Sequence, residues 1–218
     1  MQSLYVRQVA FLSAVLKDYF GAARGLKVLD WGCGKGQITY LLAGHGFEVT
    51  SCDLVAEKND SSFGQEVPII EDKGITVVPL RHPERLPFDD ASFDCVVSFG
   101  VLEHVYSDQS SLRELRRTLK PGGVAFITLL PYFLSWTQAL GRAFGNRYHD
   151  RLYNKGSLRK LAGDAHFELA GVWHGQLFPK NSVPIGLDPY LEPLDRFLCG
   201  FTPLKYLATN LEAVLIAS

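Results

Sequence analysis

The stretch VLDWGCGKG, residues 28–36, stands between two segments of different periodicity. It completes a short apolar run that is typical of a buried strand. Ile38, Leu41 and Leu42 then recur at helical spacing, before a glycine-containing stop. The glycines therefore lie on a strand-to-helix turn, where the lack of a Cβ permits positive φ and close approach of a ligand. The free N–H groups of the new helix face whatever binds there.

Two classes of ligand fit such a turn. A dinucleotide turn has the spacing G-x-G-x-x-G, and Gly32 and Gly34 match its first two positions. Gln37 occupies the third position, and the next glycine is Gly36. Asp30 precedes Gly32 by two residues, where a carboxylate repels a pyrophosphate and suits a cationic ligand. A turn shaped only for close packing of the helix on the strand is the remaining alternative.

A second predicted strand, residues 47–52, leads into Asp53. A carboxylate at the tip of the second strand can accept hydrogen bonds from both hydroxyls of a ribose, and such charge-assisted bonds are strong. Asp53 therefore indicates a nucleoside ligand without selecting its class. The alternative is an aspartate that caps the following helix.

Three further motifs follow in order. LPFDDASFD at 86–94 precedes a predicted strand at 95–99, VLEHV at 101–105 follows it, and RTLKPGG at 117–123 ends the next helix. Together with the D-x-G-C-G-x-G run at 30–36, these motifs closely resemble the class I S-adenosylmethionine-dependent methyltransferases. The resemblance is to the small-molecule enzymes of the quinone-biosynthesis and sterol type, and it covers about residues 27–130.

The resemblance implies an α/β fold, namely a doubly wound, Rossmann-like sheet of seven strands in the order 3-2-1-4-5-7-6 with the last strand antiparallel. It implies S-adenosyl-L-methionine as cofactor and S-adenosyl-L-homocysteine as product. The implied cofactor-binding residues are Asp30, Gly32, Cys33, Gly34, Gly36, Gln37, Asp53, Leu54, His82, Pro83, Phe99 and Gly100.

One position departs from the family pattern. Relatives usually carry an aspartate four residues before the leucine of L-P-F, where it bonds the adenine amino group, and this chain has His82 there. Backbone groups near His82 and Pro83, or a bond from Glu84, are the substitutes that the sequence offers.

His104 is the candidate catalytic residue, because it follows the fourth predicted strand at the edge where the methyl group would be presented. A neutral imidazole can take a proton from a hydroxyl or amine acceptor. Its alternatives are a histidine that bonds a neighbouring loop or one that only shapes the pocket. No metal site is expected, since the four cysteines lie far apart and form no C-x-x-C pair.

Composition predicts a single domain over residues 1–218, with 47% hydrophobic and 21% charged residues. The net charge of −1 gives no indication of nucleic-acid binding. No apolar run reaches the ~20 residues of a membrane span. The first 24 residues have the spacing of an amphipathic helix and not of a signal peptide, so we expect a cytoplasmic protein.

Two stretches of the sequence are not accounted for by the seven-stranded core fold. Residues 131–153 carry an apolar stripe at helical spacing, and residues 175–207 are rich in proline and apolar side chains. We expect both to form a lid over the acceptor. The alternatives are that they cover the sheet or form a dimer contact.

The predicted activity is methyl transfer from S-adenosylmethionine to a small or amphiphilic, lipid-like acceptor by in-line displacement. In such a reaction the protein mainly aligns the nucleophile with the methyl group and excludes water. Two alternatives come from other classes. One is an NAD-dependent oxidoreductase on a Rossmann sheet, and the other is a catalytically silent cofactor-binding scaffold.

Overall fold

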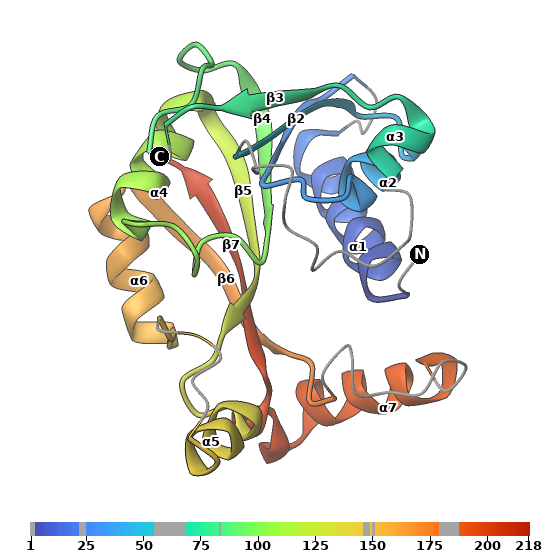
Figure 1. The fold of residues 1–218 in the computed structure, drawn as a ribbon, viewed down its shortest axis with the longest axis vertical. Helices are drawn as coiled ribbons and strands as arrows, with labels where there is room; N and C mark the ends of the chain where they lie inside the picture. Colours follow the sequence, from blue (N-terminus) through green and yellow to red (C-terminus); the bar gives the residue numbers. More distant parts are fainter. Residues whose placement is uncertain are drawn as a thin grey trace.

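The computed structural model describes residues 3–21, 25–54, 69–82, 84–145, 149, 151–178 and 188–218. One sheet of seven strands has the order β3-β2-β1-β4-β5-β7-β6 (Figure 1). Its strands are β1 (Lys27–Trp31), β2 (Glu48–Leu54), β3 (Val77–Leu80), β4 (Phe93–Phe99), β5 (Leu119–Pro131), β6 (Phe167–Gly175) and β7 (Asn210–Ala217). Strand β7 is antiparallel to both neighbours, and the pairs from β3 to β5 are parallel. The predicted fold class and strand order are therefore confirmed.

Helices cover both faces of the sheet because successive strand residues point to opposite sides. Val28 packs with α1 (Ser3–Phe20) and α2 (Gln37–Gly44), whereas its neighbour Leu29 packs in the cluster that includes α4 (Asp108–Thr118) and α6 (Lys155–Asp164). The helical side of the first cluster is supplied by Val9, Leu12, Leu16, Ile38 and Leu42. That of the second is supplied by Leu112, Leu115, Leu158 and Ala162.

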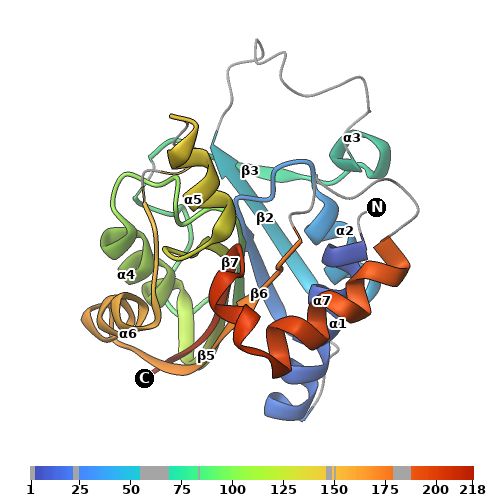
Figure 2. The ribbon, with the colours of Figure 1, turned by 90° about the horizontal axis from the view of Figure 1, so that it is seen from below.

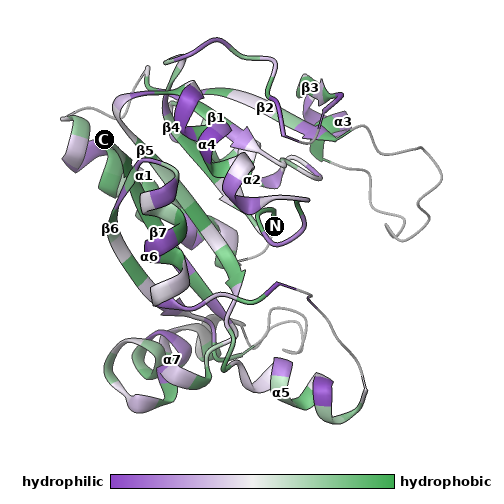
Figure 3. Cartoon of the chain, turned by 90° about the vertical axis from the view of Figure 1, so that its left-hand side faces the viewer, coloured by the Kyte–Doolittle hydropathy of each residue, from purple (hydrophilic) through white to green (hydrophobic). Residues whose placement is uncertain are grey.

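Two helices lie outside these layers. Helix α5 (Trp136–Ala143) and helix α7 (Asp188–Phe201), with the short η1 (Pro203–Leu207), lie together at one end of the molecule (Figures 1 and 3). Figure 2 shows them in front of the sheet when the molecule is seen from that end. Phe133, the first residue of the apolar stripe that the sequence predicts within 131–153, precedes α5. Within the described part of the chain, no helix combines the length and the apolar character needed to cross a bilayer.

Some strand boundaries differ from the prediction. The sequence predicts the fifth strand at residues 124–130, after the helix-ending motif, whereas β5 begins at Leu119 because Leu119 pairs with Phe93 before a register shift. The sequence predicts the third strand at residues 75–78, whereas β3 begins two residues later, at Val77. The polar stretch 54–74 predicts a short, irregular crossover. Residues 55–68 of this stretch lie outside the described residues, and α3 occupies Ile69–Lys73.

A single arginine connects two of the family motifs. The Nη1 atom of Arg117 donates to the carbonyl of Phe88 at 2.8 Å and to Oδ1 of Asp90 at 2.6 Å. Its Nη2 atom donates to the carbonyl of Leu86 at 3.2 Å. The RTLKPGG motif therefore holds the LPFDD loop against α4 by charge-assisted bonds.

Candidate functional site

The glycine-rich turn joins β1 to α2 with a left-handed backbone. Gly32 has φ 75°, Gly34 has φ 51° and Gly36 has φ 79°. The amides of Gly32 and Cys33 donate to the carbonyl of Cys52 at 2.9 and 3.1 Å, which fixes the turn against β2. A Cβ on Gly36 would lie 2.7 Å from Cγ1 of Ile70, and one on Gly32 would lie 2.4 Å from Cγ2 of Val101. Gly32 and Gly36 therefore need glycine for both conformation and space.

Asp53 lies within β2 and faces this turn. Its Oδ2 accepts from the amide of Gly34 at 2.6 Å, and its Oδ1 accepts from the amide of Leu54 at 2.7 Å. Each carboxylate oxygen keeps a second lone pair, so both can still accept from a ligand hydroxyl. The two bonds hold the side chain in one orientation beside the glycines.

A cavity of about 290 Å³ opens beside the turn and Asp53. Five residues predicted from sequence line it: Gly32, Asp53, Leu54, Gly100 and His104. Its other walls are Trp31, Leu80, Val101, Val105 and Tyr106. The site therefore lies beyond the carboxyl ends of parallel strands, where ligands bind in open α/β sheets.

The sequence analysis did not predict the other five lining residues. Trp31 and Leu80 end β1 and β3, and their apolar character marked them as sheet core. Val101, Val105 and Tyr106 belong to the loop after β4, in which only His104 was chosen for its chemistry. Proximity to the end of a strand is the signal that would have found them.

Asp30 lies beneath the turn rather than in the cavity wall, with 1% of the residue exposed. Its Oδ2 accepts from the hydroxyl of Thr39 at 2.6 Å, and that hydroxyl also lies 2.8 Å from the hydroxyl of Ser51. Burial raises the pKa of Asp30 from 3.8 to about 7, and the nearby charge of Asp53 acts in the same direction. At neutral pH this carboxyl is consequently poised to ionise when a cation binds above it.

Other residues implied by the resemblance are spread around the turn. Cys33 is buried, Gln37 begins α2, and the ring of Phe99 meets Tyr5 of α1 edge-on at 6.0 Å. His82 is exposed, and its Nδ1 accepts from the amide of Glu84 at 3.1 Å. Pro83 lies outside the described residues.

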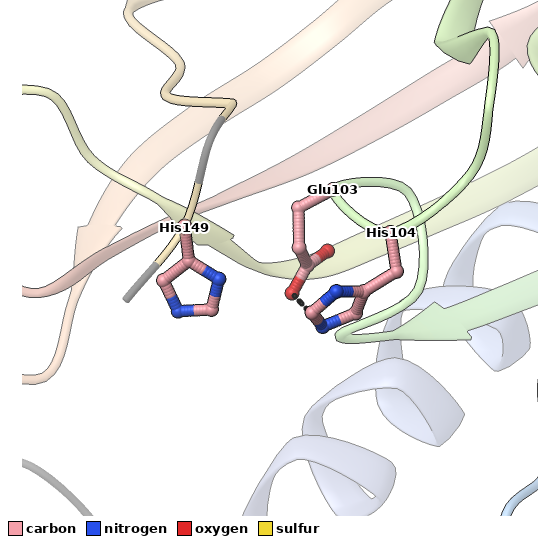
Figure 4. A group of neighbouring side chains, drawn as sticks. All are labelled: Glu103, His104 and His149. Carbon is pink, nitrogen blue, oxygen red and sulfur yellow. Dashed lines mark ion pairs between the residues drawn. The ribbon is translucent and has the colours of Figure 1, made fainter. Parts of the chain in front are cut away.

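His104 is the predicted catalytic residue, and its side chain is 65% exposed at the cavity wall. Its Nε2 atom lies 3.7 Å from Oε1 of Glu103, and its ring lies 5.7 Å from the ring of His149 (Figure 4). The side chain of Glu103 is buried, with 4% exposed. The structure thus adds two neighbours that the motif alone did not connect.

Comparison with known proteins agrees with this geometry. A family described as "Methyltransferase domain" matches residues 29–127. Demethylmenaquinone methyltransferase from Bacillus subtilis is 32% identical over 168 residues, which cover 68% of this chain and 69% of that protein. The chain belongs to the S-adenosylmethionine-dependent methyltransferases. Its glycine turn, Asp53 and the loop after β4 therefore form the candidate site of a chain in this family.

Other relatives extend the comparison. Ubiquinone biosynthesis O-methyltransferase from Caulobacter vibrioides is 34% identical over 119 residues, covering 52% of this chain and 46% of that protein. The chain spans about half the length of several curated methyltransferase relatives that it matches. A solved structure of 1,6-didemethyltoxoflavin-N1-methyltransferase from Burkholderia thailandensis shares the fold, with a TM-score of 0.58, 21% identity and coverage of 97% of this chain and 77% of that one.

The buried carboxyl of Asp30 is expected to make the free energy of unfolding depend on pH. Because the folded-state pKa of Asp30 is raised, its contribution to the free energy of unfolding is full below about pH 4 and is lost as the pH rises through about 7. Asp30→Asn removes this titration. We expect urea unfolding to show the variant gaining stability relative to the parent between about pH 5 and about pH 8. If the difference in unfolding free energy between variant and parent is the same at about pH 5 and about pH 8, the raised pKa of Asp30 is contradicted.

Proposed function

We propose that the protein transfers the methyl group of S-adenosylmethionine to an amphiphilic aromatic acceptor. The cavity bounded by Gly32 and the anchored carboxylate of Asp53 carries this proposal. Gly32 lets the ligand backbone approach, Asp53 holds the ribose hydroxyls, and Asp30 supplies negative charge beneath the methionine end. The names of the relatives, ubiquinone biosynthesis O-methyltransferase and demethylmenaquinone methyltransferase, support a quinone-like acceptor.

Adenine recognition would use the loop at 82–84 in place of the usual aspartate. Oε1 of Glu84 is buried and has no hydrogen-bond partner within the described part of the chain. We assign this oxygen to the adenine amino group, since a buried acceptor is costly while unpaired.

When bound, S-adenosylmethionine supplies a methyl group on a positively charged sulfur. An acceptor lone pair would form the new bond to the methyl carbon while the carbon–sulfur bond breaks and its electrons remain on sulfur. The acceptor proton leaves to a base or to water. The chain's own task is to align the acceptor beside His104 and to keep the site dry.

The test of this function is the affinity of the protein for S-adenosylhomocysteine, measured by calorimetry. Asp53→Ala should weaken binding by roughly 2–3 kcal/mol, because two charge-assisted bonds are lost. Asp94→Ala is the matched control, since Asp94 accepts from the amide of Lys27 at 2.9 Å at the amino end of β4. Unchanged affinity in Asp53→Ala would overturn the assignment of the ribose site.

Turnover separates the remaining alternatives. Methylation of an acceptor panel with labelled S-adenosylmethionine supports the enzyme, whereas binding without turnover supports the silent scaffold. The NAD-dependent oxidoreductase finds no support in the family comparison. A thermal shift with NAD that equals the shift with S-adenosylhomocysteine would reopen it.

The acceptor would be covered by the two stretches outside the core. Trp136 in α5 donates from Nε1 to the carbonyl of Leu177 at 2.8 Å, so the stretches 131–153 and 175–207 touch each other. A second cavity of about 300 Å³ is lined partly by the 175–207 stretch, through Gln176, Asp195 and Cys199, and partly by α1 and β6. Phe144 of the first stretch and Phe201 of the second are 75% and 83% exposed, which leaves apolar surface available to an acceptor.

Hydrogen exchange tests this lid. We expect amides in α5 and α7 to exchange more slowly when S-adenosylhomocysteine and catechol, a small aromatic probe for the acceptor, are both present. The reason is that ligand contacts suppress local opening. Helix α4, whose buried leucines lie in the core, serves as the internal control. If both stretches are protected to the same extent with and without ligands, they only cover the sheet. If their protection increases with protein concentration, they form a dimer contact.

A further inference from the structure

Three possible metal ligands converge beside the cofactor cavity. Glu103 and His104 come from the loop after β4, and His149 comes from the stretch after α5 (Figure 4). One ligand atom of each residue lies within 4.8 Å of the other two. The three therefore form one cluster although they belong to two distant segments of the chain.

Glu103 is the most informative member of the cluster. Its side chain is 4% exposed, and its Oε2 is buried without a hydrogen-bond partner among the described residues. A buried carboxyl oxygen without a partner is costly and points to a cation that completes its contacts.

The guanidinium of Arg151 is directed to partners other than the Glu103 carboxyl. Its Nε lies 3.5 Å from Oδ2 of Asp108, and its Nη1 donates to the carbonyls of Leu102 and Val105 at 3.1 and 2.9 Å. Tyr153 also donates to the carbonyl of Leu102, at 3.2 Å. These bonds tie the loop that carries Glu103 and His104 to the segment that follows His149. The ligands are thereby held near one another before an ion binds.

The donor set indicates the kind of ion. Two imidazoles and one carboxylate suit zinc, cobalt, manganese or iron, whereas calcium and magnesium prefer oxygen ligands. Ligand atoms around a tetrahedral zinc lie about 3.3 Å apart, given zinc–nitrogen distances near 2.0 Å. The exposed ring of His104 can turn to close the remaining gap. Three protein ligands leave at least one coordination position open, which is the pattern of catalytic sites.

We propose that Glu103, His104 and His149 bind a divalent transition-metal ion whose open positions take oxygen atoms of the acceptor. His104 lines the cavity with Gly32 and Asp53, so the ion lies at the border between the cofactor and acceptor regions. An ion there lowers the pKa of an acceptor hydroxyl and favours two adjacent oxygens over one. This ion-binding role is an alternative to the general-base hypothesis for His104, and the acceptor class rests on the proposed function.

Cobalt binding to the full chain tests the site directly. Titration with Co²⁺ should give visible absorption that saturates at one ion per chain. His149→Ala and the isosteric Glu103→Gln should each weaken binding by more than the roughly 10–100-fold that follows loss of an outer partner. His45→Ala is the matched control, because His45 is an exposed histidine at the end of α2. No saturable absorption, or equal binding in all variants, would overturn the site.

Two readouts separate this proposal from the proposed function. Calorimetry with S-adenosylhomocysteine on the same samples shows whether each variant keeps a folded cofactor site. If the parent protein fails to bind S-adenosylhomocysteine but gives saturable cobalt absorption, the proposed function is refuted and the ion site remains supported. Catechol should alter the cobalt absorption by filling open positions, and an unaltered spectrum would overturn the oxygen-chelating acceptor.

Discussion

Replacing Gly32 with valine is expected to abolish measurable binding of S-adenosylhomocysteine. Gly32 has φ 75°, which a β-branched residue adopts only with strain. Its Cβ would lie 2.4 Å from Cγ2 of Val101, and further side-chain atoms would extend into or displace the cavity wall. We expect a loss of more than about 100-fold, equivalent to about 3 kcal/mol, by calorimetry.

Two further variants separate the steric effect from the conformational one. Gly34→Ala imposes a similar left-handed strain at φ 51° but meets no atom within 4 Å. It should keep more affinity than Gly32→Val. Gly32→Ala combined with Val101→Ala removes the contacts at 2.4 and 3.0 Å, keeps only the contact with the Val101 Cβ at 3.3 Å, and should recover part of the binding. Near-normal affinity in Gly32→Val, with an unchanged thermal unfolding temperature, would show that the ligand does not approach this turn.

Replacing His104 with alanine is expected to lower kcat by roughly 10²–10⁴-fold, the range for loss of proton-transfer catalysis. Affinity for S-adenosylhomocysteine should be unchanged, because the side chain is exposed at the cavity wall and its ion-pair and ring neighbours are Glu103 and His149 rather than the glycine turn or Asp53. Steady-state kinetics with a competent acceptor and calorimetry measure the two effects separately. A variant with normal turnover would remove His104 from the chemistry.

His104→Gln and His149→Ala identify which task the histidine performs. Glutamine can hydrogen-bond but cannot take the proton, so near-normal turnover in His104→Gln would show that this residue only positions the acceptor. A general base working alone predicts that His149→Ala is harmless. A shared metal ion predicts that His149→Ala loses kcat as His104→Ala does. The two variants therefore separate three roles.

The glycine turn was predictable from sequence because its determinants are local. Positive φ at Gly32, Gly34 and Gly36 follows from residues adjacent in the chain, between a strand period and a helix period. Asp53 was predictable for a related reason. Parallel strands share one carboxyl edge, so the ends of β1 and β2 must meet once both are assigned. The strand order itself came from the family resemblance, because periodicity within a segment does not say which strands are neighbours.

The start of β5 was wrong in the prediction because Lys-Pro-Gly-Gly is ordinarily a helix-ending signal. Here Leu119 leaves α4 directly and pairs with Phe93, while Arg117 fixes the preceding loop. Pairing with a distant strand outweighed the local signal. Tertiary contacts commonly override propensity in this way.

The sequence by itself determined the turn, the carboxylates beside it and, through its motifs, the family. Only the tertiary structure decided that Asp30 lies below the cavity while Asp53 lines it. It also decided that His149 meets Glu103 and His104, and that Trp136 of α5 bonds the stretch that precedes α7. The physical reason is that these contacts depend on how whole layers pack across the end of the sheet. No spacing of residues along the chain encodes that packing.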